Sequence, residues 1–302
     1  MPGPEMERAS GRWRAGPVLE LEARTADGVT LRLDRLRAAG ERKGVVVCLH
    51  AMMTDGRYFG ARREASFAAT LAAAGFDVIV PDFRGHGRSR PPTAGPDDWS
   101  FDDLVELDLP AIVGASSAAS RCAPNELILL GHSLGGLVAT AALGTGRIAS
   151  PRLLVLPATC WWTLGPGASL RRRAMMATYR HVTTLLGRAP IRALRVGTAD
   201  EPRAYVHQLT GWTSARRWTS LRGVDYTIAA QAITTPVLPF VGAGDWMCTP
   251  RDARGFLGHL ACAAPLRIVG TAHGDALDPD HFQLFTRPEL RPLWTDLVDR
   301  FA

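Results

Sequence analysis

Ser133 stands in a sequence context that could make its hydroxyl a nucleophile. Gly131 and Gly135 flank it in a G-x-S-x-G pattern, which follows an apolar run and precedes an apolar, helix-like segment. A serine in a sharp strand-to-helix turn has its hydroxyl lifted above the sheet edge, near N–H groups that can stabilise an oxyanion. Glycine neighbours permit such a strained turn without side-chain clashes. The pattern predicts attack on a carbonyl group; a serine that only shapes a turn is the alternative.

The elements that must position this serine alternate between strand-like and helix-like segments from about residue 18, which is typical of an α/β sheet. The apolar run at 44–49 is continuous, as expected for a strand covered on both faces. Further strands are expected at 18–24, 29–36, 76–80, 126–130, 153–156, 237–241 and 266–269, and helices at 58–74, 101–119, 134–143, 226–233, 250–260 and 282–301. Pro110 predicts a kink or break in one helix, and Pro288 and Pro292 interrupt the last. The sequence therefore predicts an α/β fold with a mostly parallel central sheet flanked by helices.

The regular alternation fails between about residues 159 and 222, where the chain is rich in tryptophan and arginine. Around this segment the chain resembles the α/β-hydrolase superfamily. GHSLGG at 131–136 is similar to the nucleophile turn of lipase- and esterase-like members, and PDFRGHGRS at 81–89 looks like the family's turn after its fourth strand. Leu49-His50 matches the position of the family's His-Gly loop. The resemblance implies an α/β-hydrolase core at 1–158 and 223–302, with an inserted helical cap at 159–222.

The resemblance also implies the chain order serine, acid, histidine. Asp245 directly follows the expected strand at 237–241 and fits the acid, whereas the first carboxylate after the strand at 153–156 is the distant Asp200. Two histidines follow the last expected strand. His281 precedes an apolar residue, as is common for the base of this family, and is the preferred candidate. His273 lies closer to the strand beside a glycine and remains the alternative base.

By the same resemblance, the N–H groups of Leu134 and Met52 form the oxyanion hole. The chain departs from the family here, because Ala51 stands where glycine is usual. Four residues are expected to line the substrate pocket: His50, Met53, Trp161 and Trp162. Methionine adapts to apolar ligands of varied shape, although Met52 and Met53 could equally fill core space. Aromatic and arginine side chains of the cap favour an apolar or aromatic substrate group, and leave an anionic one open.

These residues together predict a serine hydrolase that cleaves a carboxylic ester, thioester or lactone through an acyl-enzyme on Ser133, with a small-molecule acyl substrate. Such chemistry needs no cofactor and no metal. Two alternatives stay open. Carbon–carbon bond hydrolysis, perhydrolysis or acyl transfer could use the same groups, and a non-catalytic small-molecule-binding protein could keep them on the same fold.

Composition narrows the remaining classes. The net charge of +6 comes with 29 acidic residues, and no nucleic-acid motif accompanies the arginine clusters at 171–173 and 216–217, so nucleic-acid binding is not expected. No stretch approaches the roughly 18 apolar residues of a membrane span, and residues 1–17 lack the apolar core of a secretory signal, so a cytoplasmic protein is expected. Five widely spaced cysteines without a C-x-x-C motif predict neither disulfides nor a zinc site. The oligomeric state cannot be read from these residues.

Overall fold

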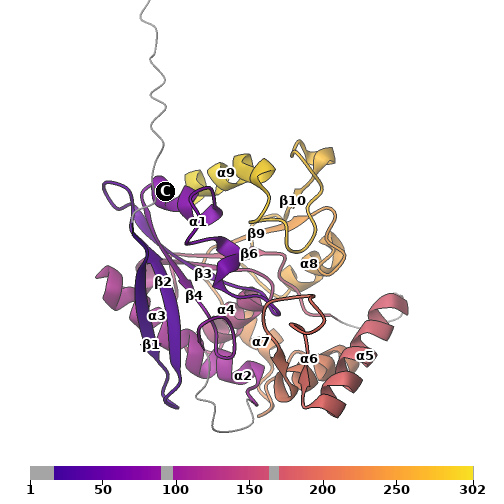
Figure 1. Ribbon diagram of the computed structural model, residues 1–302. Coiled ribbons are helices and arrows are strands. Elements are labelled where there is room, and N and C mark those ends of the chain that lie inside the picture. Colours follow the sequence, from indigo (N-terminus) through magenta and orange to yellow (C-terminus); the bar gives the residue numbers. More distant parts are fainter. Residues whose placement is uncertain (1–16, 90–97, 163–169, 302) are drawn as a thin grey trace, which may run out of the picture.

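An eight-stranded sheet forms the centre of the computed structural model, which describes residues 17–89, 98–162 and 170–301 (Figure 1). The prediction for the first 17 residues therefore lies almost wholly outside the described part. The strand order is β1-β2-β4-β3-β5-β6-β9-β10. The strands are β1 (Leu19–Arg24), β2 (Thr30–Leu36), β3 (Gly44–Leu49), β4 (Phe76–Pro81), β5 (Leu127–Gly131), β6 (Leu153–Pro157), β9 (Val237–Gly242) and β10 (Arg267–Val269). Only β2 pairs antiparallel with its neighbours β1 and β4, and the other pairs are parallel, which confirms the predicted mostly parallel sheet.

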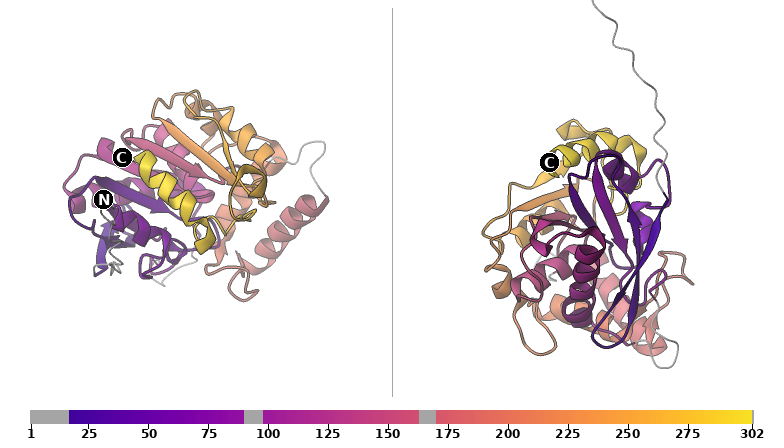
Figure 2. Two further views of the ribbon diagram at one scale, coloured as in Figure 1. Left: turned by 90° about the horizontal axis from the view of Figure 1, so that it is seen from above. Right: turned by 90° about the vertical axis from the view of Figure 1, so that its left-hand side faces the viewer.

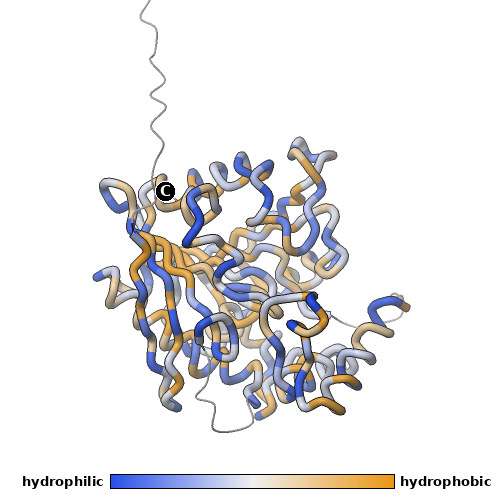
Figure 3. The backbone as a smooth tube through the Cα atoms, in the orientation of Figure 1, coloured by the Kyte–Doolittle hydropathy of each residue, from blue (hydrophilic) through white to orange (hydrophobic). Residues whose placement is uncertain are grey.

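Helices cover both faces of this sheet. Helices α1 (Phe67–Ala73) and α9 (Arg291–Phe301) pack on one face, and α3 (Leu109–Ser120) and α4 (Leu134–Gly144) pack on the other. Strand β3 supplies Val45, Val47 and Leu49 to the face covered by α3 and α4, and Val46 and Cys48 to the opposite face. Because both faces are covered, the central strands are apolar throughout, and the hydrophobic colour gathers on them in Figure 3.

The predicted helix at 58–74 is wrong in its first half. A short 3-10 helix (η1, Gly56–Phe59) forms there, and α1 begins only after Ser66. The Asp55 carboxylate caps η1, and Gly60 ends it with φ of 72°, a left-handed conformation that glycine adopts without cost. The Ser66 hydroxyl then accepts the N–H of Ala69 and starts α1 anew. Two N-cap residues, Asp55 and Ser66, only eleven positions apart, therefore divide the helix.

Proline shapes two other helices. Pro110 lies in a continuous helical run made of α2 (Phe101–Asp103), a π-helical turn (η2, Leu104–Asp108) and α3, so the predicted disturbance takes the form of a widened turn. At the end of the chain, a 3-10 turn (η5, Pro288–Leu290) precedes α9. Residues 281–286, including His281, therefore form turns rather than the start of the last helix.

Residues 170–222, which we call the α5–α6 segment, lie between β6 and β9 along the chain. The segment contains α5 (Leu170–Leu186), α6 (Arg203–Ala215) and two paired two-residue strands that the sequence did not reveal, β7 (Arg188–Ala189) and β8 (Glu201–Pro202). Helix α7 (Tyr226–Ala230) lies between this segment and β9, and α8 (Pro250–Leu257) follows β9. Figures 1 and 2 show α5 at the periphery, on the side of the molecule away from β1. Among the described residues no helix is long and apolar enough to cross a membrane.

The turn between β5 and α4 is pressed against the end of β3. A Cβ atom added to Gly135 would lie 2.5 Å from the carbonyl oxygen of Leu49, which is far inside contact distance. Any larger residue at this position must push α4 away from β3.

We therefore expect Gly135→Ala to lower the free energy of unfolding by about 1–3 kcal/mol, the usual cost of overpacking. Gly114→Ala is the matched control, because Gly114 is exposed within α3 and a Cβ there meets nothing within 4 Å. This control should gain up to about 1 kcal/mol from helix propensity. Urea denaturation of both variants measures the difference, and equal stabilities would contradict the close approach.

Candidate active site

Ser133 lies in a strained turn between β5 and α4. Its backbone has φ of 52° and ψ of −109°, in the half of the map that non-glycine residues rarely occupy. Its N–H donates to the carbonyl of Pro157 at 3.1 Å, and its own carbonyl accepts the N–H of Leu137 at 3.0 Å. These bonds tie the turn to β6 and to α4, so the conformation is held from both sides.

His281 joins this serine to Asp245. The Ser133 hydroxyl donates to Nε2 of His281 over 2.9 Å, and Nδ1–H of the same ring donates to Oδ2 of Asp245 over 2.7 Å. The side chains of His281 and Asp245 are 4% and 0% exposed, so water does not compete for the bond between them. The structure thus brings together three residues that lie 112 and 36 positions apart in the chain.

The Asp245 carboxylate is oriented by its own backbone. Its Oδ1 accepts the N–H groups of Met247 at 2.8 Å and Cys248 at 2.7 Å, which leaves Oδ2 to face His281. The alternative base, His273, lies in an exposed 3-10 turn (η4, Thr271–His273) and bonds neither Ser133 nor Asp245. The geometry therefore favours His281 as the base.

His132 packs directly against His281. Its ring stacks on Tyr58 with centroids 4.9 Å apart and lies at a tilt against His281, also at 4.9 Å. The ring is fully buried, and burial holds the pKa of His132 well below its usual range, with the nearby His281 adding to the effect. Burial thus favours the neutral form of His132, whose ring packs between Tyr58 and His281.

Two backbone N–H groups are placed near the serine without a partner. Leu134 is the first residue of α4, and Met52 follows the end of β3. Within the part of the chain that the structure describes, no hydrogen bond engages either N–H. Both residues line the same cavity as Ser133.

A cavity of about 560 Å³ opens in front of Ser133. Its walls come from the end of β3, from the loops after β6 and β9, and above all from α5 and the residues after it. The predicted pocket residues Met53, Trp161 and Trp162 line it, and so does Met52. Apart from Ser133, His281 and Thr178, the walls are apolar or aromatic, including Leu137, Met175, Met176, Tyr179, Val182, Ile191, Leu194, Val196, Tyr205, Leu209 and Trp246.

The prediction that His50 lines the pocket is wrong. The ring is fully buried beneath the loop, where Nδ1–H donates to the Ala51 carbonyl at 2.9 Å and Nε2 accepts the N–H of Phe83 at 3.1 Å. Burial lowers the pKa of His50 to about 3, with His86 adding to the effect, so the ring is neutral. His50 instead connects the loop after β3 to the loop after β4.

Among the described residues, no lysine, arginine, aspartate or glutamate lines the cavity. Arg171 lies over the Trp246 ring at 3.9 Å, Arg180 donates to the Thr210 hydroxyl at 2.9 Å, and Arg217 lies 3.8 Å from Asp225. None of these arginines is among the lining residues. The described residues also contain no cluster of metal-ligating side chains.

Sequence reasoning missed Glu201. This carboxylate is fully buried in β8 and bonds the N–H of Met53, next to one of the two free N–H groups. The only signal in the sequence was the acidic pair Asp200-Glu201 in a segment that is otherwise strongly basic, and nothing connected it to a loop 148 residues earlier.

A model of the serine aminopeptidase S33 family (Hydrolase_4) matches residues 40–269. The chain belongs to this family. Among curated proteins, this S33-family chain is 28% identical to lipase lipl-1 of Caenorhabditis elegans over 151 residues, or 45% of the chain and 36% of the relative. The match thus spans little more than a third of that relative's length.

Solved structures share the fold with this S33-family member. The esterase EaEST from Exiguobacterium antarcticum superimposes with a TM-score of 0.63 at 17% identity, covering 94% of the chain and 99% of the esterase. A putative aryl esterase from Burkholderia cenocepacia has a TM-score of 0.61 at 16% identity, covering 93% and 97%. At such low identity these neighbours establish the α/β-hydrolase fold alone, and the substrate has to be inferred from the site itself.

The two histidines can be separated by substitution. We expect His281→Ala to lose the reactivity of Ser133 toward a fluorophosphonate by at least about 10³-fold, because the proton acceptor is gone. His273→Ala should label at the wild-type rate, since its side chain is exposed. Labelling rates followed by mass spectrometry decide this, and the reverse pattern would move the base to His273.

Proposed function

We propose that this protein is a serine hydrolase that cleaves carboxylic esters, or related thioesters and lactones, carrying a large apolar group. The observation that carries the proposal is His281, bonded at once to the Ser133 hydroxyl and to the Asp245 carboxylate at the wall of an apolar cavity. A buried carboxylate–histidine–serine chain is the arrangement that activates a hydroxyl as a nucleophile.

In the proposed reaction, the Ser133 oxygen attacks the ester carbonyl while its proton passes to Nε2 of His281. Asp245 stabilises the imidazolium that forms. The N–H groups of Leu134 and Met52 donate to the tetrahedral oxyanion. Collapse of this intermediate breaks the bond to the alcohol, which leaves with the proton from His281. Water then attacks the acyl-enzyme, passes a proton to His281, and the carboxylic acid departs as the serine recovers its proton.

The walls of the cavity support an apolar ester over an aminopeptidase substrate. A free peptide N-terminus carries a positive charge, and burying it requires a carboxylate or several hydrogen-bond acceptors. No carboxylate lines the cavity within the described residues. An acyl or alcohol chain, in contrast, gains free energy from each methylene that it removes from water.

Residues 159–222 act as a cap in this proposal. Side chains of α5 and α6 close the cavity above Ser133, including Met176, Tyr179 and Leu209. Trp212 and Trp218 of the same segment are buried and pack on Phe101, so they support the cap rather than contact the ligand.

Fluorophosphonate labelling with p-nitrophenyl ester turnover tests the nucleophile. We expect Ser133→Ala to abolish labelling and to lower kcat/KM by at least about 10⁴-fold while the thermal midpoint stays unchanged. A fully active Ser133→Ala would refute the proposal. A folded wild type that neither labels nor hydrolyses any ester would instead favour a binding protein on this fold.

Ester chain length tests the cavity. We expect kcat/KM to rise about fourfold per added methylene, since burying a methylene yields about 0.8 kcal/mol, until the cavity is full. Val182→Trp narrows the cavity and should reduce kcat/KM for the decanoate more than for the acetate. Leu185→Trp is the matched control on the same helix, because Leu185 is 70% exposed. A flat chain-length profile would contradict the apolar selectivity.

A further inference from the structure

The turn after β3 has an unusual backbone conformation that is stabilised by hydrogen bonds from the α5–α6 segment. Met53 has φ of 61°, a left-handed conformation that a methionine does not adopt without support. Both of its backbone polar groups bond to the α5–α6 segment. Its carbonyl accepts the N–H of Thr198 at 2.8 Å, and its N–H donates to Oε1 of Glu201. The support for this turn therefore comes from residues almost 150 positions later in the chain.

The two backbones meet at close range where this contact begins. A Cβ atom added to Gly197 would lie 2.3 Å from the carbonyl oxygen of Met53, so only glycine allows the segment to approach. Asp55, two residues beyond Met53, also has a side-chain hydrogen bond to Thr198. Both Met53 and Asp55 of this turn therefore contact residues within 197–201.

Glu201 is anchored in turn by a buried histidine. Its Oε1 accepts a second hydrogen bond, from Nε2–H of His86 at 3.3 Å, and both side chains are 0% exposed. Nδ1–H of His86 donates to the Arg84 carbonyl at 2.9 Å. Both ring nitrogens of His86 therefore face oxygen atoms, and this arrangement favours the protonated ring. Burial, the largest single effect, would lower the pKa of His86, but Glu201, the Arg84 carbonyl and Asp82 together raise it above its usual value.

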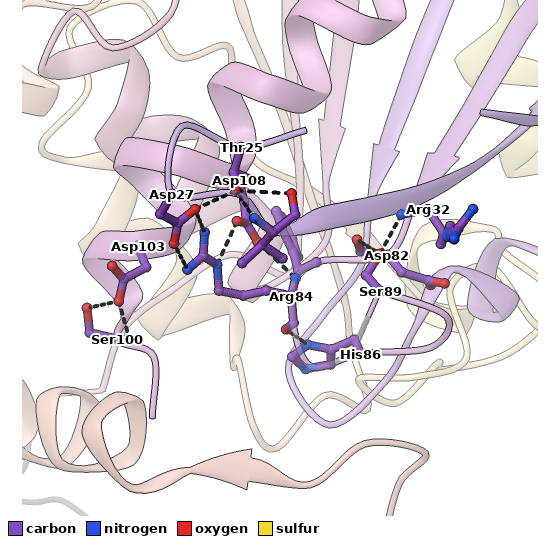
Figure 4. A network of polar contacts seen from close by, with 12 residues as sticks. Thr25, Asp27, Arg32, Asp82, Arg84, His86, Ser89, Ser100, Asp103 and Asp108 are labelled. Carbon is purple, nitrogen blue, oxygen red and sulfur yellow. Dashed lines mark hydrogen bonds and ion pairs between the residues drawn. The ribbon is translucent and has the colours of Figure 1, made fainter. Parts of the chain in front are cut away.

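The loop that carries His86 is itself fixed to the core, as Figure 4 shows. The Arg84 guanidinium donates to Asp108 at 2.7 Å and to Asp27 at 2.8 Å. The backbone N–H of Arg84 also donates to Asp108 at 2.8 Å. Glu201 consequently links a rigid loop of the core to the strained turn after β3.

We propose that Glu201 is a positioning residue, which holds Met53 in its left-handed conformation so that the adjacent Met52 N–H faces the oxyanion. This inference rests on the proposed hydrolase function. When Glu201 is lost, the Met53 N–H and the His86 ring lose their buried acceptor, and the turn can relax to negative φ. As the turn relaxes, the Ala51–Met52 peptide rotates, and its N–H, the Met52 donor, no longer faces the oxyanion. Catalysis then requires the α5–α6 segment to be in place, and the same segment also forms a wall of the pocket.

Steady-state kinetics of Glu201→Ala and Glu201→Gln test this role. Loss of one oxyanion donor typically lowers kcat by about 10²–10³-fold, so Glu201→Ala should lose about 100-fold in kcat with KM within about twofold. Glu201→Gln retains an oxygen acceptor and should lose less. Asp200→Asn is the matched control, because the neighbouring Asp200 makes only partly exposed contacts with Arg188 and Arg192, and its kcat should stay within about twofold.

Inhibitor binding separates positioning from general damage. A trifluoromethyl ketone that forms a tetrahedral adduct on Ser133 should bind Glu201→Ala more weakly in proportion to kcat, whereas a long-chain alcohol that only fills the cavity should bind as to the wild type. Unchanged kcat in Glu201→Ala would overturn the proposal, and so would equal losses of kcat and alcohol binding. An active Ser133→Ala would refute the hydrolase function instead, so the two failures are distinguishable.

A second variant keeps the test independent of folding losses. Glycine adopts positive φ without cost, so the Met53→Gly background should need Glu201 less. We expect Glu201→Ala to reduce kcat by about tenfold or less in that background, compared with about 100-fold in the wild type. Equal losses in both backgrounds would show that Glu201 does not act through the Met53 conformation.

Discussion

The pairing of β3 with β5 is the constraint on which the site depends. Leu49 lies opposite Gly131, so the two strands end side by side and release their chains at the same edge of the sheet. The turn after β5 presents the Ser133 hydroxyl and the Leu134 N–H, and the turn after β3 presents the Met52 N–H. Parallel strands fix this proximity through the backbone alone. Side chains then have to complete the arrangement, and they come from the loops after β9 and β10 and from the α5–α6 segment.

Residues that follow a core strand directly were predictable. Ser133, Asp245 and the fold around them follow from apolar runs with polar residues at their ends, because a buried strand leaves a strong signal and fixes the position of the next residue in space. Choosing between His281 and His273 as the base was harder from sequence. Both follow β10 by several residues, and the turns between them decide where each side chain lies. Only the structure shows that the chain folds back so that His281 reaches Ser133 and His273 faces solvent.

Interactions between distant loops were not predictable in the same way. The position of His50 suggested a pocket residue, yet its two ring nitrogens are used by Ala51 and Phe83. Glu201 lies in a segment without regular hydrophobic period, and its partners Met53 and His86 are more than 100 positions away. Local patterns contain no information on such contacts, because they depend on how closely two irregular backbones approach. Caps such as Ser66 were readable in principle, but the apolar run around them favoured a longer helix.

The apolar walls of the cavity also affect the second half of the proposed reaction. A water molecule is stable in a cavity only where it finds two to four polar partners, and these walls offer few. An acyl chain that fills the space therefore shields its own ester bond to Ser133 from solvent. An alcohol that partitions into the same space competes with water for the acyl group on favourable terms. In the proposed reaction, the amount of water in the cavity then determines whether the acyl group passes to water or to an alcohol. Wall residues such as Met176, Val182 and Leu209 control that amount, whereas Ser133, His281 and Asp245 serve both outcomes alike.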